Sequence, residues 1–215
     1  MLTFTTRTAR RAVAVVSTTA LLTVGLAACS GTPEATEPAP TPTEIATPEP
    51  TSTAAQEILE PFGFADLSAK ELVDTLDAQP LEERPADLRV SIRPDELLVS
   101  DASGAEAAMP MPQDAFYVSL APYVDSTHEC YFHSLTTCTG EMQNVPIDVL
   151  VTDAETGKVL IDEEITTFAN GFLGLWLPRD RQVEVTFESE GRSATTTLDT
   201  SNPDDATCVT TMQLA

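Results

Sequence analysis

From residue 88 onward, hydrophobic positions alternate with polar ones over short stretches. This alternation is typical of β-strands with one buried face. We predict strands at residues 88–92, 97–100, 115–122, 146–152, 158–166, 171–177, 182–188, 193–199 and 208–214. Turns are predicted at 93–96, 153–157, 178–180 and 189–191, and the small-residue stretch 101–113 is predicted to connect two strands. Short strands with regular turns predict an antiparallel β-sandwich.

Large apolar residues on these strands are assigned to the core of the sandwich rather than to a cofactor pocket. The predicted core residues are Ile147, Val149, Phe172, Trp176, Val185 and Phe187. The assignment follows because such residues supply most of the apolar area that a domain buries.

The segment before the strands has a helical pattern. Leucine and valine recur at helical spacing, and Ser68 with Glu71 three residues later forms the sequence signature of a capping box. We predict an amphipathic helix over 68–78, ended by Pro80, and a short helical turn at 81–87. The fold class predicted is therefore mostly β, of the α+β type, with a short N-terminal helical segment followed by an antiparallel β-sandwich-like domain.

The first 28 residues have the organisation of a signal peptide. Three arginines precede an apolar run at 12–24, which is too short for a permanent membrane span. The sequence Leu-Ala-Ala-Cys at 26–29 looks like a lipobox, the pattern at which bacterial lipoproteins are cleaved and acylated on the new N-terminal cysteine. An ordinary secretory signal is the alternative. We therefore expect an exported protein, lipid-anchored through Cys29 to the outer face of the bacterial cell membrane, in the periplasmic or cell-wall space.

Residues 29–56 are rich in proline, threonine and glutamate and contain no aromatic residue. Such a segment cannot bury enough apolar surface to offset its ordering entropy, so a disordered stalk is predicted. Residues 57–215 then form one continuous globular unit, with a helical lead and the first strands at 57–113 and a β-rich metal-binding domain at 114–215. This length is normal for one domain.

The chain carries a formal net charge of -23. Removal of the three leader arginines makes the mature protein more negative still. This charge argues against nucleic acid as a partner and against electrostatic docking on anionic lipid, which leaves the lipid anchor as the membrane contact. The charge serves solubility alone, or it concentrates cations near the domain.

The candidate chemistry is concentrated in the stretch 128–138, which contains His128, Cys130, His133 and Cys138. Cys208 is the remaining cysteine outside the leader region. Sulfur and imidazole ligands select copper or zinc over hard cations. An antiparallel hairpin with its loop centred on residue 134 would place Cys130 and Cys138 directly opposite, with Cα atoms roughly 4.5 to 5.5 Å apart. In that hairpin His128 shares a face with Cys130, and His133 lies near the turn.

Three cysteines are an odd number, which indicates a ligand, a free thiol or an intermolecular bond. One reading is a disulfide between two of them with the third cysteine inert, in a structural or interaction module on a lipid-anchored stalk. The other is a metal site. Three thiolates in a trigonal arrangement suit Cu(I), whereas a tetrahedral Zn²⁺ site would need His128 or His133 as a fourth ligand, so copper is favoured over zinc. No motif supplies an ordered base and an oxyanion hole, so no catalytic residue is predicted.

The run PYVDSTHECYFHSLTTCTGE at 122–141 resembles the signature of the CueP family of bacterial periplasmic copper-binding proteins. The runs TFANGF at 167–172, WLPR at 176–179 and TCVTT at 207–211 are similar to it as well, and the resemblance spans residues 58–215. It implies a protein for copper tolerance outside the cytoplasm, with Cys130, Cys138 and Cys208 as the functional positions. It also implies transfer of copper to a periplasmic superoxide dismutase and reduction of Cu(II) to Cu(I). Such reduction would require a thiol reductant to reset the site.

Overall fold

The computed structural model describes residues 52–215. The predicted signal peptide, Cys29 and the stalk up to residue 51 lie outside the described residues. Residues 53–56, which we assigned to the stalk, form the first turn of helix α1 (Thr53–Leu59), because Ser52 caps this helix by accepting a hydrogen bond from the Ala55 amide. Within the part of the chain that the structure describes, no helix is long and apolar enough to cross a membrane.

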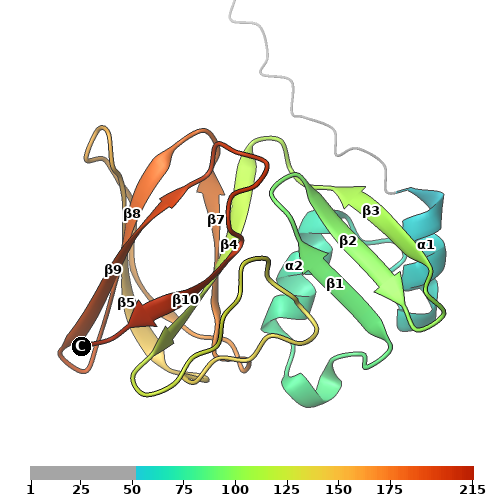
Figure 1. Cartoon of the computed structure of the whole chain (residues 1–215), viewed down its shortest axis with the longest axis horizontal. Coiled ribbons are helices and arrows are strands. Elements are labelled where there is room, and N and C mark those ends of the chain that lie inside the picture. The colour runs from blue at the N-terminus through green and yellow to red at the C-terminus, as the bar shows by residue number, and fades with distance from the viewer. Residues whose placement is uncertain (1–51) are drawn as a thin grey trace, which may run out of the picture. The chain divides into compact units, whose positions relative to one another are not determined.

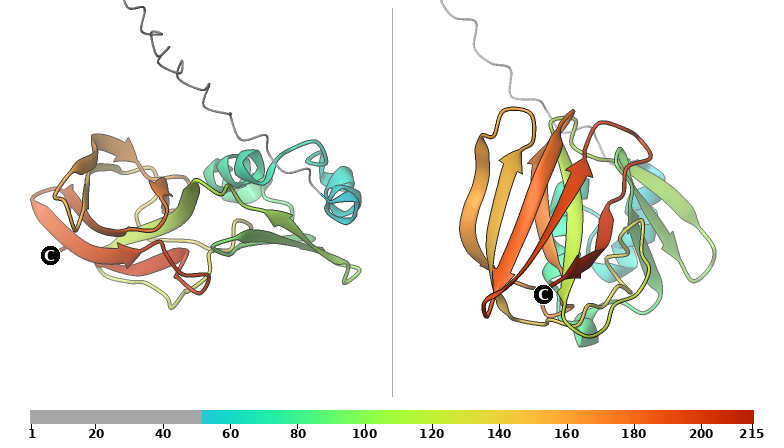
Figure 2. Two further views of the ribbon diagram at one scale, coloured as in Figure 1. Left: turned by 90° about the horizontal axis from the view of Figure 1, so that it is seen from above. Right: turned by 60° about the vertical axis from the view of Figure 1, so that its left-hand side comes forward.

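The N-terminal part consists of two helices on one face of a small sheet (Figures 1 and 2). Its elements are α1, η1 (Glu60–Phe62), α2 (Ala69–Ala78), η2 (Leu81–Glu83), β1 (Leu88–Ile92), β2 (Glu96–Asp101) and β3 (Glu106–Pro110). The sheet is antiparallel in the order β1-β2-β3. The predicted capping box of α2 is confirmed, with the Ser68 hydroxyl and the Glu71 carboxylate each bonded to the other residue's amide.

Strand β3 lies in the stretch that we predicted to be a connection, so that prediction was wrong. Met109 is the one fully buried residue of β3, whose other positions are small, charged or proline. The strand is held by its backbone pairing with β2 rather than by an apolar face. Its sequence therefore lacks the alternation on which the strand predictions depend.

The C-terminal part is a sandwich of two sheets, in the orders β10-β4-β7 and β6-β5-β8-β9 (Figure 1). Its strands are β4 (Ala115–Tyr123), β5 (Pro146–Asp153), β6 (Val159–Thr166), β7 (Leu173–Pro178), β8 (Gln182–Ser189), β9 (Arg192–Asp199) and β10 (Cys208–Gln213). The mostly β fold with a short helical lead is thus confirmed. Four predicted core residues, Ile147, Val149, Val185 and Phe187, lie fully buried between the two sheets.

One strand pair departs from the expected antiparallel arrangement. β10 pairs with β4 in parallel, with Cys208 opposite Ser119 and Val209 opposite Leu120. A parallel neighbour requires a connection that carries the chain back to the same end of the sheet. Hydrophobic alternation gives no information on this choice, because it is the same for either strand direction.

Strand β4 is buried on both faces, which makes it the element shared by the two parts of the molecule. Phe116, Val118 and Leu120 point into the sandwich core. Tyr117 belongs to the core that the helices cover. Since successive side chains of a strand point to opposite faces, the positions between the sandwich residues face α2. This second face of β4 forms one wall of the site described below.

Two residues that we assigned to the sandwich core lie elsewhere. Trp176 is only partly buried and packs against the helix-covered core, where its indole N–H donates to Asp74 at 2.7 Å. Phe172 is fully buried, but it packs in a separate small cluster with Ala121 and Cys208, against Cys130 and Cys138. Phe172 precedes β7, so the alternation of side chains along that strand does not determine which way the Phe172 side chain points.

Candidate metal centre

The residues between β4 and β5 form a long loop that carries Cys130, His133 and Cys138 and runs from the sandwich toward β1 (Figure 1). The predicted hairpin is wrong, because the loop pairs with another element rather than with itself. The Ile92 amide donates to the His133 carbonyl at 2.8 Å, and the Leu135 amide donates to the Val90 carbonyl at 2.9 Å. This pairing fixes the loop on the edge of β1.

A tight turn nevertheless brings the two loop cysteines together. The Cys138 amide donates to the Ser134 carbonyl at 3.1 Å, and the Ser134 amide donates to the Cys138 sulfur at 3.4 Å. The Sγ atoms of Cys130 and Cys138 are 3.6 Å apart. Both sulfurs can therefore reach one ion, as we expected, although a turn rather than a pair of strands places them.

Cys208 is the first residue of β10 and reaches the same place from the C-terminal end of the chain. Its backbone amide donates to the Tyr131 carbonyl at 3.0 Å, and its side chain is 2% exposed. Its sulfur lies 3.7 Å from Nδ1 of His133. The ligand atoms of Cys138, His133 and Cys208 all lie within 4.8 Å of one another. The structure thus brings together the cysteines that are distant in sequence.

Thr207 links the loop, β1 and β10 through hydrogen bonds. Its buried hydroxyl donates to the Ile92 carbonyl at 2.8 Å and accepts from the His133 amide at 3.1 Å. Its own carbonyl accepts from the Ser119 amide of β4 at 2.9 Å. The residue next to Cys208 therefore sets the position of that cysteine relative to His133.

Asp77 of α2 lies at the centre of a buried hydrogen-bond network. Its Oδ1 accepts from Nε2 of His133 at 2.9 Å and from the Asn170 amide at 2.8 Å. Its Oδ2 accepts from the hydroxyls of Tyr117 at 2.6 Å and Ser119 at 2.9 Å. With Nε2 of the imidazole bonded to the carboxylate, Nδ1 is the ring nitrogen that faces the sulfur atoms.

Asp77 and His133 form a buried ion pair. Burial opposes the protonated imidazole, but the adjacent carboxylate raises the pKa of His133 to about 9. Burial likewise opposes ionisation of Asp77, but the imidazolium and the hydrogen bonds outweigh it, so the pKa of the carboxyl is lowered. The Arg84 guanidinium, 3.9 Å from Oδ1, adds a second positive charge and also donates to the Cys138 carbonyl at 3.1 Å.

The three sulfurs differ in their ionisation. Hydrogen bonding to the Cys138 sulfur raises the pKa of the Cys130 thiol to about 12. Hydrogen bonds from the other two cysteines, and the adjacent imidazolium of His133, lower the pKa of Cys138. Hydrogen bonding to the other two sulfurs, together with burial, raises the pKa of Cys208. Cys138 therefore loses its proton most readily of the three, and the thiolate is the form that binds metal.

His128 lies on the exposed side of the loop. Its ring contacts Phe172 with the centroids 6.1 Å apart, and the His133 ring contacts the same phenyl group at 4.6 Å. Its ligand nitrogen lies within 4.8 Å of the sulfurs of Cys130 and Cys138. Both histidines singled out in the sequence are therefore within reach of the sulfurs, although in different surroundings.

A close contact between two glycines holds the loop against the chain before β7. A Cβ atom at Gly140 would lie 2.6 Å from the Gly171 carbonyl oxygen, which is closer than van der Waals contact allows. Gly171 has a φ of +81°, in the left-handed region that favours glycine. The Gly140 amide donates to the Asn170 carbonyl at 2.6 Å, so this contact also ties the loop to a partner of Asp77.

Asp77, Asn170 and Arg84 were not predicted as site residues. One signal could have identified Asp77: the residue follows Val73 by four positions and so lies on the apolar face of α2, where a charge is uncommon. A charged residue on a buried helix face requires a partner. The identity of that partner, far along the chain, is a property of the tertiary structure.

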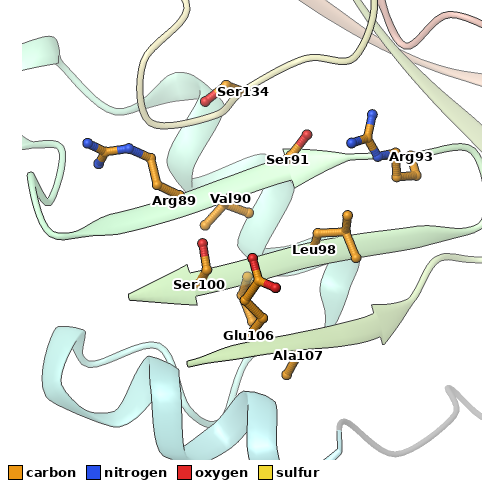
Figure 3. Close-up of a pocket in the computed structure, with 10 residues that line it drawn as sticks. Arg89, Val90, Ser91, Arg93, Leu98, Ser100, Glu106, Ala107 and Ser134 are labelled. Carbon is orange, nitrogen blue, oxygen red and sulfur yellow. The ribbon is translucent and has the colours of Figure 1, made fainter. Parts of the chain in front are cut away.

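A separate pocket of about 460 Å³ lies over the outer face of the β1-β2-β3 sheet (Figure 3). Its lining includes Arg89 and Arg93 of the β1 region and Glu106 of β3. Ser134 is the one residue that the metal-site loop contributes to it. Its lining contains neither sulfur nor imidazole, so this pocket is distinct from the candidate metal centre.

Comparison with known proteins gave two findings. The family model described as periplasmic copper-binding protein CueP matches residues 71–213. The crystal structure of S.CueP matches with 36% sequence identity and a TM-score of 0.70, and the match covers 77% of this chain and all of that one. No curated protein matches the sequence.

Proposed function

The chain belongs to the CueP family of periplasmic copper-binding proteins, and from this membership we propose that it binds Cu(I) through the thiolates of Cys130, Cys138 and Cys208. The observation that carries the proposal is the convergence of Cys208 and Cys138 at the buried His133 imidazole, with the Cys130 sulfur 3.6 Å from that of Cys138. Soft sulfur donors and a low coordination number suit Cu(I) better than they suit hard cations. Copper is the cargo of this site.

Cys138 gives the site a first ligand for the ion. Its pKa is lowered, so this sulfur becomes anionic more readily than the other two. Cys130 and Cys208 then lose their protons as they bind. Zinc is the competing ion, because His128 or His133 could supply the fourth ligand of a tetrahedral site beside the three sulfurs.

The proposal extends to the place and purpose of binding. We propose that residues 1–28 are removed as a signal peptide, that Cys29 carries the lipid and that the segment after it is a stalk. The copper-binding part would then serve copper tolerance at the outer face of the cell membrane. Metabolic labelling with a palmitate analogue tests the anchor, and Cys29→Ser is expected to abolish the label.

We also propose that the site reduces Cu(II). Formation of a disulfide between Cys130 and Cys138, whose sulfurs are 3.6 Å apart, would release two electrons, together with any proton that the two thiols still carry, and reduce two Cu(II) to two Cu(I). An external thiol reductant would reopen the bond. The Cu(I) would pass to an extracytoplasmic acceptor such as a superoxide dismutase. A Cu(I)-specific indicator, added to reduced protein and Cu(II) without other reductants, measures this reaction.

Metal analysis of the anaerobically purified full chain tests the central proposal. We expect one or more copper ions per chain in the wild type after desalting, with little zinc. Replacement of Cys130, Cys138 and Cys208 together by serine is expected to abolish copper binding. Cys29→Ser is the matched control and should retain copper, because this cysteine is reserved for the lipid. Copper retained by the triple variant, or zinc in place of copper, would contradict the proposal.

A further inference from the structure

The sulfur and imidazole donors fall into two groups rather than one. His128, Cys130 and Cys138 form the first group, and His133, Cys138 and Cys208 form the second. In each group all ligand atoms lie within 4.8 Å of one another. Cys138 is common to both groups, whereas Cys130 belongs only to the first and Cys208 only to the second. Each group contains two sulfurs and one nitrogen, which is a complete trigonal ligand set for Cu(I).

The two groups differ in their access to solvent. In the first, which we call the outer group, His128 is exposed and both cysteines are partly exposed. In the second, the inner group, His133 is fully buried and Cys208 is 2% exposed. An ion that arrives from solvent therefore meets the outer group first, and an ion in the inner group is shielded from competing ligands.

Other contacts make the inner group rigid. His133 is fixed through Nε2 by Asp77, and Cys208 is fixed through its backbone amide by Tyr131. The amide of Ser134 is bonded to the shared sulfur. A donor set that is already in position loses little entropy when it binds an ion. Among the described residues, the His128 side chain makes no comparable hydrogen bond, and the aromatic ring that it contacts is that of Phe172.

We propose that copper is captured by His128, Cys130 and Cys138 and then moves to His133, Cys138 and Cys208, with Cys138 bound throughout. The inference rests on the proposed function and refines it: all three cysteines bind Cu(I), but Cys130 does so during capture and Cys208 does so during retention. It assigns the two histidines different roles: His128 serves capture, and His133 serves retention.

The transfer is a ligand exchange at constant oxidation state. The bonds from copper to His128 and Cys130 break, and bonds to Cys208 and to Nδ1 of His133 form. The proton that leaves Cys208 passes to the Cys130 thiolate that copper has left, and the proton that leaves Nδ1 of His133 passes to solvent. No electron is transferred.

Alkylation of the reduced full-length protein tests the proposal under anaerobic conditions. One equivalent of Cu(I) is supplied as its bicinchoninate complex, and iodoacetamide labelling of each cysteine is read by mass spectrometry. In the loaded wild type we expect Cys130 to react as it does in the metal-free protein, because copper has moved to the inner group. In Cys208→Ser the ion should remain in the outer group and protect Cys130.

Loading kinetics test the role of His128 separately. From the bicinchoninate complex, His128→Ala should load copper about tenfold more slowly than the wild type, while its final affinity stays within about threefold. Glu129→Gln is the matched control, since this neighbouring residue is exposed and belongs to neither group. It should load at the wild-type rate. Both are surface substitutions, so this result remains interpretable even if Cys208→Ser fails to fold.

The outcomes separate the two proposals. Equal protection of Cys130 in the wild type and in Cys208→Ser would overturn the transfer and leave one site in which three sulfurs bind together. A wild-type loading rate for His128→Ala would also overturn it. If copper changes the labelling of no cysteine in the wild type, the proposed function itself fails.

Discussion

Oδ1 of Asp77 lies 2.9 Å from Nε2 of His133, and both side chains are completely buried. The carboxylate comes from a helix in the N-terminal part of the molecule, and the imidazole comes from the loop that carries two of the cysteines. A carboxylate that holds the far nitrogen of a metal-binding histidine fixes the orientation of its ring. The helical lead thus takes part in the site, although it supplies no ligand.

Asp77→Ala should reduce the free energy of unfolding by about 3–5 kcal/mol, because it leaves a buried imidazolium without its partner. Urea denaturation of the metal-free protein measures this change. Asp87→Ala is the control: Asp87 is exposed, so its loss should change stability by less than about 0.5 kcal/mol. Equal effects of the two substitutions would show that the ion pair does not stabilise the fold.

Thr207→Val keeps the shape of the side chain but removes its hydroxyl. The His133 amide loses its acceptor and the Ile92 carbonyl loses one donor, both in a buried place. We expect a loss of about 1–3 kcal/mol in stability and a weaker Cu(I) affinity, since Cys208 is the next residue. Thr195→Val, at an exposed hydroxyl on β9, should leave both quantities nearly unchanged. Urea denaturation measures the change in stability, and competition with a Cu(I) chelator measures the change in affinity. Unchanged Cu(I) affinity in Thr207→Val would show that the Thr207 hydroxyl does not position Cys208.

Gly140→Ala should separate the loop from the chain before β7, because its methyl group would overlap the Gly171 carbonyl. The expected result is a lower midpoint of thermal unfolding and a lower Cu(I) affinity. Gly104→Ala provides the comparison: Gly104 has a φ of +87° but no atom near the added carbon, so only backbone strain of about 1–2 kcal/mol is expected. Copper binding by Gly104→Ala should be normal, and the same loss of affinity in both variants would argue against a local effect.

Cu(I) affinity should fall as the pH is lowered. The pKa of Cys130 is raised to about 12 and that of Cys208 is also raised, so both are protonated at neutral pH and copper must displace their protons. Each proton released weakens binding by about tenfold for every unit by which the pH falls. Competition with bicinchoninate between pH 8 and pH 6 measures the slope. An affinity independent of pH would mean that no protonated thiol takes part in binding.

The strands of the sandwich could be predicted because alternating residues such as Val149, Val185 and Phe187 have one face in a core. The edge strand β3 could not, since it has a single fully buried side chain. The parallel direction of β10 was missed for a different reason: the pattern of a strand is the same in either direction.

Within the site, the proximity of Cys130 and Cys138 was predicted correctly from the wrong geometry. The hairpin model considered only the local sequence, whereas the loop is bonded to β1. The position of Cys208 and the network around Asp77 depend on contacts between segments far apart in the chain. Such contacts leave no periodic signal, so a charged residue on an apolar helix face was the only local indication of the network.

Strand β4, which is buried on both faces, has a consequence for the order of events during folding. Its two faces are covered by elements that are made before it and after it, and Cys208 joins the site only when β10, the last strand, has paired beside it. The group of His133, Cys138 and Cys208 is therefore incomplete until β10 has paired with β4. Truncation before Cys208 should therefore remove the inner group while leaving the loop that carries His128, Cys130 and Cys138 untouched.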